Sequence, residues 1–376
     1  MDTRTIVILG GYGNTGRALA RLLLEHSDFR LVLAGRDTGK AEREAAGWNA
    51  HYPGRTRGAA ADAADGESLR RLFRGADFVV VASSTSPHAR TVVEAALAVG
   101  VDLMDPQFSR AKLKVLRELA PRIEAAGRCA ITDGGFHPGM PGLLVRYAAG
   151  RMDRLCSARV GSVIQIDWRE LSFSPGTLDE LVEELRDFQM LHYRDGRWRS
   201  MGWVESFRPV WMTFDHGFGR RTTAPMFLEE LRPLPDLIPG LEETGFFVGG
   251  FNWFVDYIVM PAGIVWLRLS PRSGRAVGRV LEWALRRFSR PPFGTLLRLE
   301  AHGVRDGVES DLVVYVYHPD GYVLTAAPMA ACLLQVLDGS ARRPGLHFQA
   351  LLADPARLLS DLQRMGVEVT SHSSPR

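Results

Sequence analysis

Three glycines close to the start of the chain have the spacing of a loop that binds a dinucleotide. Gly11, Gly13 and Gly16 lie between an apolar run at 6–9 and an amphipathic run at 17–24. Such glycines allow a tight turn, close approach of the backbone to a pyrophosphate, and close packing of the helix on the strand. The N–H groups at the start of that helix then face the phosphates. The whole loop is predicted to contact the cofactor: Gly10, Gly11, Tyr12, Gly13, Asn14, Thr15 and Gly16.

The end of the second predicted strand indicates which dinucleotide is bound. An NAD site usually has Asp or Glu at this point, to bind the ribose 2′-hydroxyl. Here the strand at 31–35 is followed by Arg36, whose guanidinium can pair with a 2′-phosphate. Asp37 follows directly, so NAD remains a possible cofactor. The alternative interpretation of Arg36 is a solvated turn residue with no role in binding. The favoured prediction is NADP(H).

Loops at the carboxyl ends of the other predicted strands should line the same crevice. Asp62 could accept a hydrogen bond from the adenine amine, or it could be an ordinary turn or helix-capping aspartate. The further cofactor contacts predicted on this ground are Asp62, Ala63, Ala82, Ser83, Ser84 and Thr85.

Acid–base chemistry is assigned to three residues near the end of the alternating region. His137 lies in a Gly/Pro-rich loop at 134–142 and is predicted to titrate near neutrality and to act as acid or base. Asp105 and Asp133 end neighbouring strands and could orient that histidine or bind a substrate amine. For the histidine, the alternative is a capping or solvated side chain; for the aspartates, it is helix capping.

These residues need an alternating fold to bring them together. Apolar runs alternate with amphipathic runs through residues 1–135, which predicts a doubly wound parallel sheet of Rossmann type, an α/β fold with right-handed crossovers. The predicted strands are 6–9, 31–35, 58–62, 77–82, 101–105 and 129–133, and the helices between the later ones are 67–75, 88–99 and 110–126.

The pattern changes after the loop at 134–142. Residues 136–324 are predicted to form an α+β substrate and dimerisation domain with a mainly antiparallel sheet, including a hairpin at 298–318 turned by Asp306 and Gly307. Helices are expected at 178–188 and 276–288. Residues 325–376 are predicted as a helical return that packs on the Rossmann domain and ends in a disordered polar tail at 371–376.

The stretch 246–269 is unusually apolar. Asp256 and Pro261 interrupt it, so its uncharged run is shorter than the roughly 20 residues of a spanning helix. We expect no membrane span but a buried or interfacial helix, and a dimer contact, a substrate channel and peripheral membrane association all stay open. Seven of the eight tryptophans fall in the middle region, where they could fill a core or line a channel for a bulky apolar substrate: Trp168, Trp198, Trp203, Trp211, Trp253, Trp266 and Trp283.

Composition narrows the functional class. The 376 residues carry a net charge of only +3, with scattered basic residues, so nucleic acid is not an expected partner. Cys129, Cys156 and Cys332 have no metal-ligand spacing, so no metal site is predicted; reduced cysteines, with no leader before the first strand, favour a cytoplasmic protein.

Four segments resemble the saccharopine dehydrogenase family and its NADP-binding domain. They are Gly10-Gly11-Tyr12-Gly13-Asn14-Thr15-Gly16-Arg17, Leu33-Ala34-Gly35-Arg36, Gly135-Phe136-His137-Pro138-Gly139 and Gly321-Tyr322-Val323-Leu324-Thr325-Ala326. The resemblance implies a Rossmann domain, an α+β domain that also mediates homodimer formation, and hydride transfer from NADPH.

Three functions remain open on these grounds. The first is an NADP(H)-dependent oxidoreductase acting on an imine, or an activated C=C or C=O, of a small-molecule intermediate. The second, also implied by the resemblance, is a trans-acting enoyl reductase of a lipid or polyketide-like intermediate. The third is a dinucleotide-binding sensor or scaffold without turnover.

Overall fold

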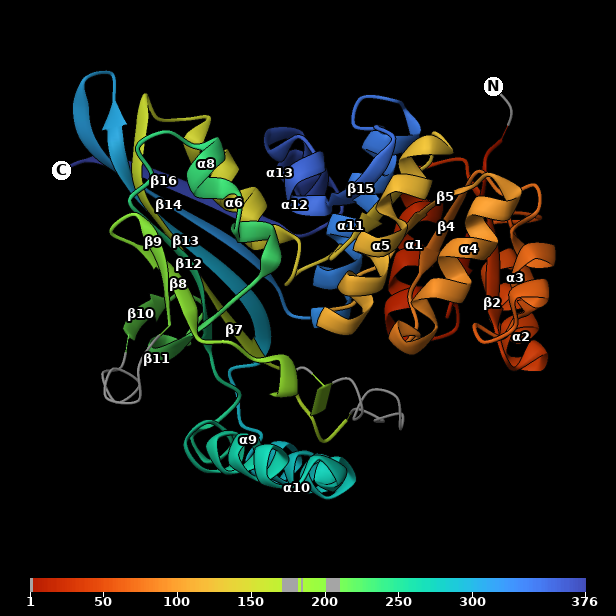
Figure 1. Ribbon diagram of the computed structural model, residues 1–376, viewed down its shortest axis with the longest axis horizontal. Coiled ribbons are helices and arrows are strands. Elements are labelled where there is room, and N and C mark those ends of the chain that lie inside the picture. Colours follow the sequence, from red (N-terminus) through yellow and green to blue (C-terminus); the bar gives the residue numbers. More distant parts are fainter. Residues whose placement is uncertain (1–2, 171–181, 184, 201–209) are drawn as a thin grey trace. The chain divides into compact units, whose positions relative to one another are not determined.

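The chain forms two compact units. The computed structural model describes residues 3–170, 182–183, 185–200 and 210–376. Unit 1 comprises Met1–Met140 and Tyr322–Met365, and unit 2 comprises Pro141–Gly321 and Gly366–Arg376 (Figure 1). Each unit is described by itself below.

Unit 1 contains a seven-stranded parallel sheet in the order β15-β6-β5-β4-β1-β2-β3. Its strands are β1 (Thr5–Leu9), β2 (Arg30–Gly35), β3 (Thr56–Ala60), β4 (Phe78–Val81), β5 (Asp102–Met104), β6 (Cys129–Thr132) and β15 (Gly345–Phe348). Its helices are α1 (Asn14–His26), α2 (Thr38–Asn49), α3 (Gly66–Phe73), α4 (Ala89–Val99), α5 (Arg110–Ala125), α11 (Gly321–Leu337), α12 (Gln349–Leu352) and α13 (Pro355–Arg364).

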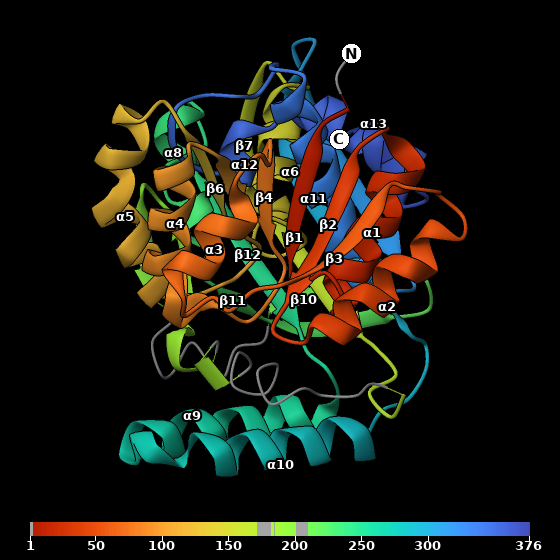
Figure 2. The ribbon, with the colours of Figure 1, turned by 90° about the vertical axis from the view of Figure 1, so that its right-hand side faces the viewer.

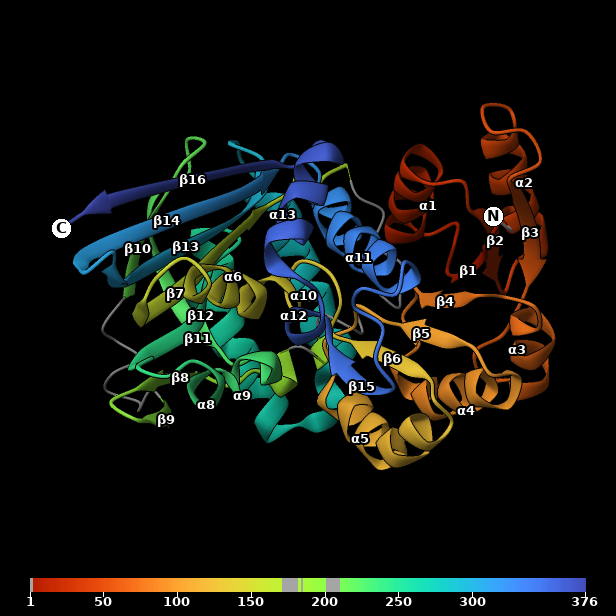
Figure 3. The same cartoon turned by 90° about the horizontal axis from the view of Figure 1, so that it is seen from above.

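Helices cover both faces of this sheet. Figure 3 shows α1 and α11 on one face and α4 and α5 on the other. The central strands are buried over nearly their whole length because both faces are covered, which is why they read as continuous apolar runs. The chain order reverses between β1 and β4, and an open α/β sheet binds its ligand outside the carboxyl ends of the strands at such a point. The predicted Rossmann-type sheet is confirmed.

Unit 2 contains a nine-stranded, mostly antiparallel sheet. Its main path runs β10-β11-β12-β7-β13-β14-β16, with β8 paired to β12 and β9 paired to β8. The strands are β7 (Arg154–Gln165), β8 (Leu191–Arg194), β9 (Arg197–Ser200), β10 (Val210–Phe214), β11 (Gly219–Met226), β12 (Glu243–Gly249), β13 (Gly294–Arg305), β14 (Val308–His318) and β16 (Glu368–Pro375). The helices are α6 (Met140–Ala149), α8 (Leu234–Leu237), α9 (Met260–Leu269) and α10 (Gly274–Arg287), with a π-helical turn, η4 (Val255–Val259), before α9.

The second sheet confirms the predicted α+β pattern and the long hairpin. β13 and β14 pair in register, with Arg305 opposite Val308 at the turn. Asp306 and Gly307 both have positive φ, 52° and 75°, as a two-residue hairpin turn requires. The pair β12–β7 is parallel, so the sheet is mixed rather than purely antiparallel.

Two expectations about unit 2 are wrong. The tail at 371–376 is not disordered, because residues up to Pro375 form β16 along the edge of β14. The prediction failed because the side chains of this segment are polar, whereas its order comes from backbone hydrogen bonds to the open edge of β14. The apolar stretch 246–269 is not one helix either, since β12 extends to Gly249 and η4 precedes α9. The expected helix at 178–188 lies largely outside the described residues.

Among the described residues, no helix combines the length and apolar character needed to cross a bilayer.

Candidate cofactor site

The glycine loop joins β1 to α1 and leaves no room for side chains. The N–H groups of Gly10 and Gly11 donate to the carbonyl of Ala34, at 2.7 and 3.2 Å. A Cβ at Gly16 would lie 2.2 Å from the carbonyl oxygen of Gly10, and a Cβ at Gly10 would lie 2.5 Å from that of Ala82. The backbone is therefore packed on itself, and only glycine fits.

The start of α1 is open for an anion. Its N-cap residue is Gly13, and no side chain in the described ranges caps it, whereas α2, α3 and α5 are capped by Asp37, Asp65 and Ser109. The first N–H groups of α1 consequently keep their donors available to a phosphate. Asn14 and Thr15 form the first residues of this helix.

The end of β2 separates the roles of Arg36 and Asp37. The Asp37 carboxylate accepts from the backbone N–H of Lys40 at 2.9 Å and caps α2. Arg36 is exposed and makes no hydrogen bond or ion pair with any residue in the described part of the chain. Tyr12 packs over this strand end, where its ring occupies the space that a side chain at Gly35 would need, and its hydroxyl accepts from the N–H of Asp37 at 3.2 Å.

The remaining predicted contacts lie at two further strand ends. After β3, Asp62 accepts from the N–H of Ala64 at 3.0 Å, the contact expected of a turn aspartate, and Ala63 is buried. After β4, the carbonyl of Ser83 accepts from the N–H of Thr85 at 2.8 Å, and Ser84 is exposed. The buried hydroxyl oxygen of Ser83 has no hydrogen-bond partner among the residues that the structure describes. Ala82 donates its N–H to Leu9 at 2.7 Å, which ties β4 to β1.

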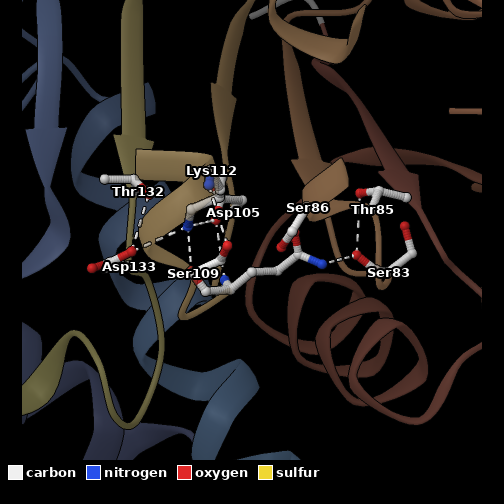
Figure 4. Close-up of polar contacts among 9 residues, drawn as sticks. Ser83, Thr85, Ser86, Asp105, Ser109, Lys112, Thr132 and Asp133 are labelled. Carbon is white, nitrogen blue, oxygen red and sulfur yellow. Dashed lines mark hydrogen bonds and ion pairs between the residues drawn. The ribbon is translucent and has the colours of Figure 1, made fainter. Parts of the chain in front are cut away.

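Asp105 and Asp133 meet at a buried lysine. Lys112, on α5, donates from Nζ to both carboxylates, and the distance to Asp133 is 3.1 Å (Figure 4). Its side chain is only 2% exposed. Lys112 Nζ also donates to the carbonyl of Gln107, whose side chain reaches the carbonyl of Ser83 and the hydroxyl of Ser86. The ends of β4, β5 and β6 are thus joined by one polar network.

Burial and charge act against each other in this network. Burial lowers the pKa of Lys112, but the carboxylates of Asp105 and Asp133 outweigh it and hold that pKa above its usual value. Burial raises the pKa of Asp133, and the nearby ammonium offsets this only in part. The strand-end aspartates were predicted to orient His137, to bind a substrate amine or to cap helices. What the structure shows is that each accepts a hydrogen bond from Lys112.

His137 lies in a loop that the returning C-terminal elements hold. Gln349, the first residue of α12, accepts from the N–H of Gly135 at 3.1 Å and donates to its carbonyl at 3.2 Å. The ring of His137 meets that of Phe136 edge-on at 4.7 Å. Burial lowers the pKa of His137 to about 4, so the prediction that it titrates near neutrality is wrong. The imidazole is neutral at neutral pH.

Sequence reasoning missed Lys112, Gln107 and Gln349. A signal for Lys112 was present, because it stands on the apolar face of α5 with Leu116, Leu119 and Ile123 at helical spacing. A lysine on such a face needs buried carboxylate partners, and Asp105 and Asp133 were already at hand. Gln107 and Gln349 had no comparable signal, because their side chains bond to backbone groups and, for Gln107, to the hydroxyl of Ser86.

Comparison with known proteins also indicates that unit 1 contains a dinucleotide-binding domain. Residues 6–131 match the family model of the saccharopine dehydrogenase NADP binding domain. Saccharopine dehydrogenase (L-Glu forming) from Saccharomyces cerevisiae is 14% identical and matches with a TM-score of 0.69 over 99% of this chain and 100% of that chain.

Two further solved structures are similar at lower scores. A dehydrogenase from Chromobacterium violaceum is 12% identical, with a TM-score of 0.46 over 97% of this chain and 94% of that chain. A myo-inositol dehydrogenase from Corynebacterium glutamicum is 12% identical, with a TM-score of 0.45 over the full length of both chains. The family match and the glycine loop both indicate NAD(P) as the dinucleotide of unit 1. Residues 6–131 are therefore similar to the saccharopine dehydrogenase NADP binding domain, in a chain that has the fold of saccharopine dehydrogenase.

Proposed function

We propose that this protein is an NADP(H)-dependent oxidoreductase that reduces an imine, or an activated C=C or C=O bond, of a small-molecule intermediate. The observation that carries the proposal is the unpartnered Arg36 beside the glycine loop. A guanidinium left free at the end of β2 fits a 2′-phosphate, while Asp37 is engaged in capping α2. This favours NADP(H) over NAD(H).

The chain's own residues divide the work of holding the cofactor. The loop 10–16 and the start of α1 bind the pyrophosphate, Arg36 binds the 2′-phosphate, and the segment 82–85 lies beside the nicotinamide half. Asp62 and Ala63 contact the adenine half of the cofactor. The unpartnered hydroxyl of Ser83 supports the assignment, because a buried polar atom without a partner is costly unless a ligand satisfies it. When bound, NADPH supplies the hydride.

Reduction also consumes a proton, and the polar network suggests where it is held. Asp133 has a raised pKa and is our candidate for the residue that keeps a proton. Asp105 accepts from Lys112 and from the N–H of Gln107, which makes it a positioning residue. His137, being neutral, serves as a hydrogen-bond partner for the substrate rather than as a stored imidazolium.

A turnover assay tests the proposal directly. NADPH consumption is measured with the full-length chain and two substrate classes, a 2-keto acid with a primary amine and a 2-enoyl thioester. Oxidation with one class identifies the reaction, and His137→Ala should then reduce turnover while NADPH affinity stays unchanged.

Oxidation of NADPH with the 2-enoyl thioester would identify the protein as a trans-acting enoyl reductase. The observation in favour of this second function is the exposed apolar surface of unit 2. Tight NADPH binding with no oxidation in either class would contradict the enzyme proposal and support a sensor or scaffold.

A further inference from the structure

The segment 253–290 carries most of the exposed large hydrophobic side chains of the described residues. We call residues 253–290, which contain η4, α9 and α10, the helical hairpin; Figure 2 shows its two helices side by side. Eleven large hydrophobic side chains are exposed among the described residues, and eight of them lie on this hairpin: Trp253, Tyr257, Ile258, Val265, Trp266, Leu269, Val280 and Trp283. Such a concentration marks an interaction surface rather than ordinary surface scatter.

The exposed residues form one face of α9. Ala262, Val265 and Leu269 follow one another at intervals of three and four residues, so they line one side of α9, and Trp266 stands beside them. Leu269 is 81% exposed. The opposite side of the helix is buried. The outer face is therefore apolar in its own right and is not the edge of the core.

The buried side explains why the helices are held together. Val255, Val259 and Leu267 pack with Val277 and Leu281 of α10 in one apolar cluster. Gly263 lets the two helices approach closely, since a Cβ there would lie 3.2 Å from Val277. The core of the hairpin is thus complete without the outer face of α9, and stability does not require that face to be apolar.

Aromatic rings at one end of the hairpin are fixed but exposed. Trp253 and Trp283 both pack edge-on against Phe288, at 5.7 and 6.0 Å between ring centroids. Trp253 nevertheless remains 61% exposed. Tryptophan and tyrosine at the border of an apolar surface are typical of side chains that sit at the headgroup level of a bilayer.

The hairpin also concentrates positive charge. It contains seven arginines and two acidic residues, a net charge of +5, while the whole chain carries +3, so the rest of the chain is net −2. Both acids are occupied locally, since Asp256 accepts from the N–H of Phe251 at 2.8 Å and Glu282 pairs with Arg286 at 3.1 Å. The exposed arginines are Arg268, Arg272, Arg275, Arg279, Arg287 and Arg290.

We propose that the outer face of this hairpin docks on an anionic lipid surface, with α9 lying in the interface and the arginines contacting headgroups. An apolar helix face with basic flanks and tryptophans is the pattern of interfacial helices. Arginines near such a surface add electrostatic attraction to the burial of the apolar face. A helix of ten residues is about 15 Å long and cannot span a hydrocarbon core of about 30 Å, so it lies on the membrane.

A second copy of the chain fits this surface less well. A two-fold contact would bring the same patch of both copies together, and the arginines of one would face those of the other. Like charges across an interface are costly, whereas anionic lipids neutralise them.

Vesicle co-sedimentation of the full-length chain tests the proposal. We expect binding to phosphatidylcholine vesicles that contain about 30% phosphatidylglycerol, weaker binding to pure phosphatidylcholine, and a loss of binding at high salt. The double variant Val265→Glu/Leu269→Glu should reduce partitioning at least about tenfold. Leu237→Glu/Val308→Glu is the matched control, because these residues are similarly exposed in unit 2 but lie off the hairpin.

Two double charge-reversal variants separate the effect of the hairpin's positive charge from the effect of the protein's net charge. Arg275→Glu/Arg279→Glu should reduce binding to the anionic vesicles by at least about tenfold, while Arg30→Glu/Arg57→Glu changes the net charge equally in unit 1 and should have little effect. Circular dichroism and NADPH affinity confirm that each variant is folded. Wild-type protein that ignores anionic vesicles, hairpin variants that bind as wild type does, or a dimer that depends on the hairpin and binds no vesicles would overturn the proposal.

Discussion

The two sides of β1 differ in what their polar groups do. On the β2 side, the N–H groups at the start of α1 and the Arg36 guanidinium have no side-chain partner in the described part of the chain. On the β4 to β6 side, Lys112, Asp105 and Asp133 are buried and bind one another. The first side is built to receive charge from a ligand. The second has its ionisable groups already paired with one another, and it holds three strand ends in place.

The difference predicts unequal responses to mutation. Removing a group that has no partner within the protein should lower the affinity for the cofactor and leave the free energy of unfolding nearly unchanged. Groups that balance one another in the interior affect stability, because removing one leaves the others unpaired.

The largest effect is expected at Lys112. Lys112→Met would leave the buried carboxyl groups of Asp105 and Asp133 without the ammonium that they share, at a cost of about 3–5 kcal/mol in the free energy of unfolding. Urea denaturation measures it. Lys114→Met, two residues along the same helix and exposed, is the control and should change stability by less than about 0.5 kcal/mol. Similar losses in both variants would show that the buried network does not carry the stability assigned to it.

A pH dependence of stability is expected from His137. Its pKa is about 4 in the folded protein and 6.5 in its ordinary range, so the unfolded chain takes up a proton first as the pH falls. Stability should therefore decline between pH 6.5 and about 4, by about 2–3 kcal/mol in total. In His137→Gln this part of the decline should vanish, while His26→Gln, an exposed histidine on α1, should keep it. A decline of unchanged size in His137→Gln would contradict the assignment.

The glycine loop should tolerate no side chain. Gly16→Ala places a Cβ 2.2 Å from the Gly10 carbonyl oxygen, and we expect a loss of about 1–3 kcal/mol in stability together with weaker NADPH binding. Gly47→Ala is the matched substitution, because nothing lies within 4 Å of its Cβ position on α2. That variant should be more stable by about 0.4–1 kcal/mol, with NADPH affinity unchanged. Thermal unfolding and a fluorescence titration measure both effects, and equal tolerance at the two positions would refute the close packing of the loop.

The same comparison explains what could be predicted from sequence. The glycine loop and six of the seven strands of unit 1 were predictable, because each depends on neighbours within a few residues and on strand periodicity. The seventh, β15, lies in a region that was predicted to be helical. The Lys112 network joins α5 to the ends of β5 and β6, and it requires knowing how those elements pack. The polar β16 was not predicted for a related reason, since its order comes from backbone bonds to β14 rather than from its own side chains.

The tryptophans of the middle region show the limit of composition. They were expected to fill a core or line a channel, and Trp168 is indeed buried. Trp211, Trp253, Trp266 and Trp283 are exposed instead, and Trp203 lies outside the described residues. Counting aromatic residues cannot distinguish a core from a surface, because both use the same side chains and differ only in where the fold places them.

The central claim is that Arg36 selects NADP(H), and a fluorescence titration with NADPH and NADH tests it most directly. Arg30→Ala is the control, since Arg30 is exposed at the opposite end of β2. Wild type and Arg30→Ala should bind NADPH more tightly than NADH by about 1–3 kcal/mol, or roughly 5- to 150-fold. In Arg36→Ala the two affinities should become nearly equal, through a loss of NADPH binding alone. Equal affinities in the wild type, or an unchanged preference in Arg36→Ala, would contradict the account.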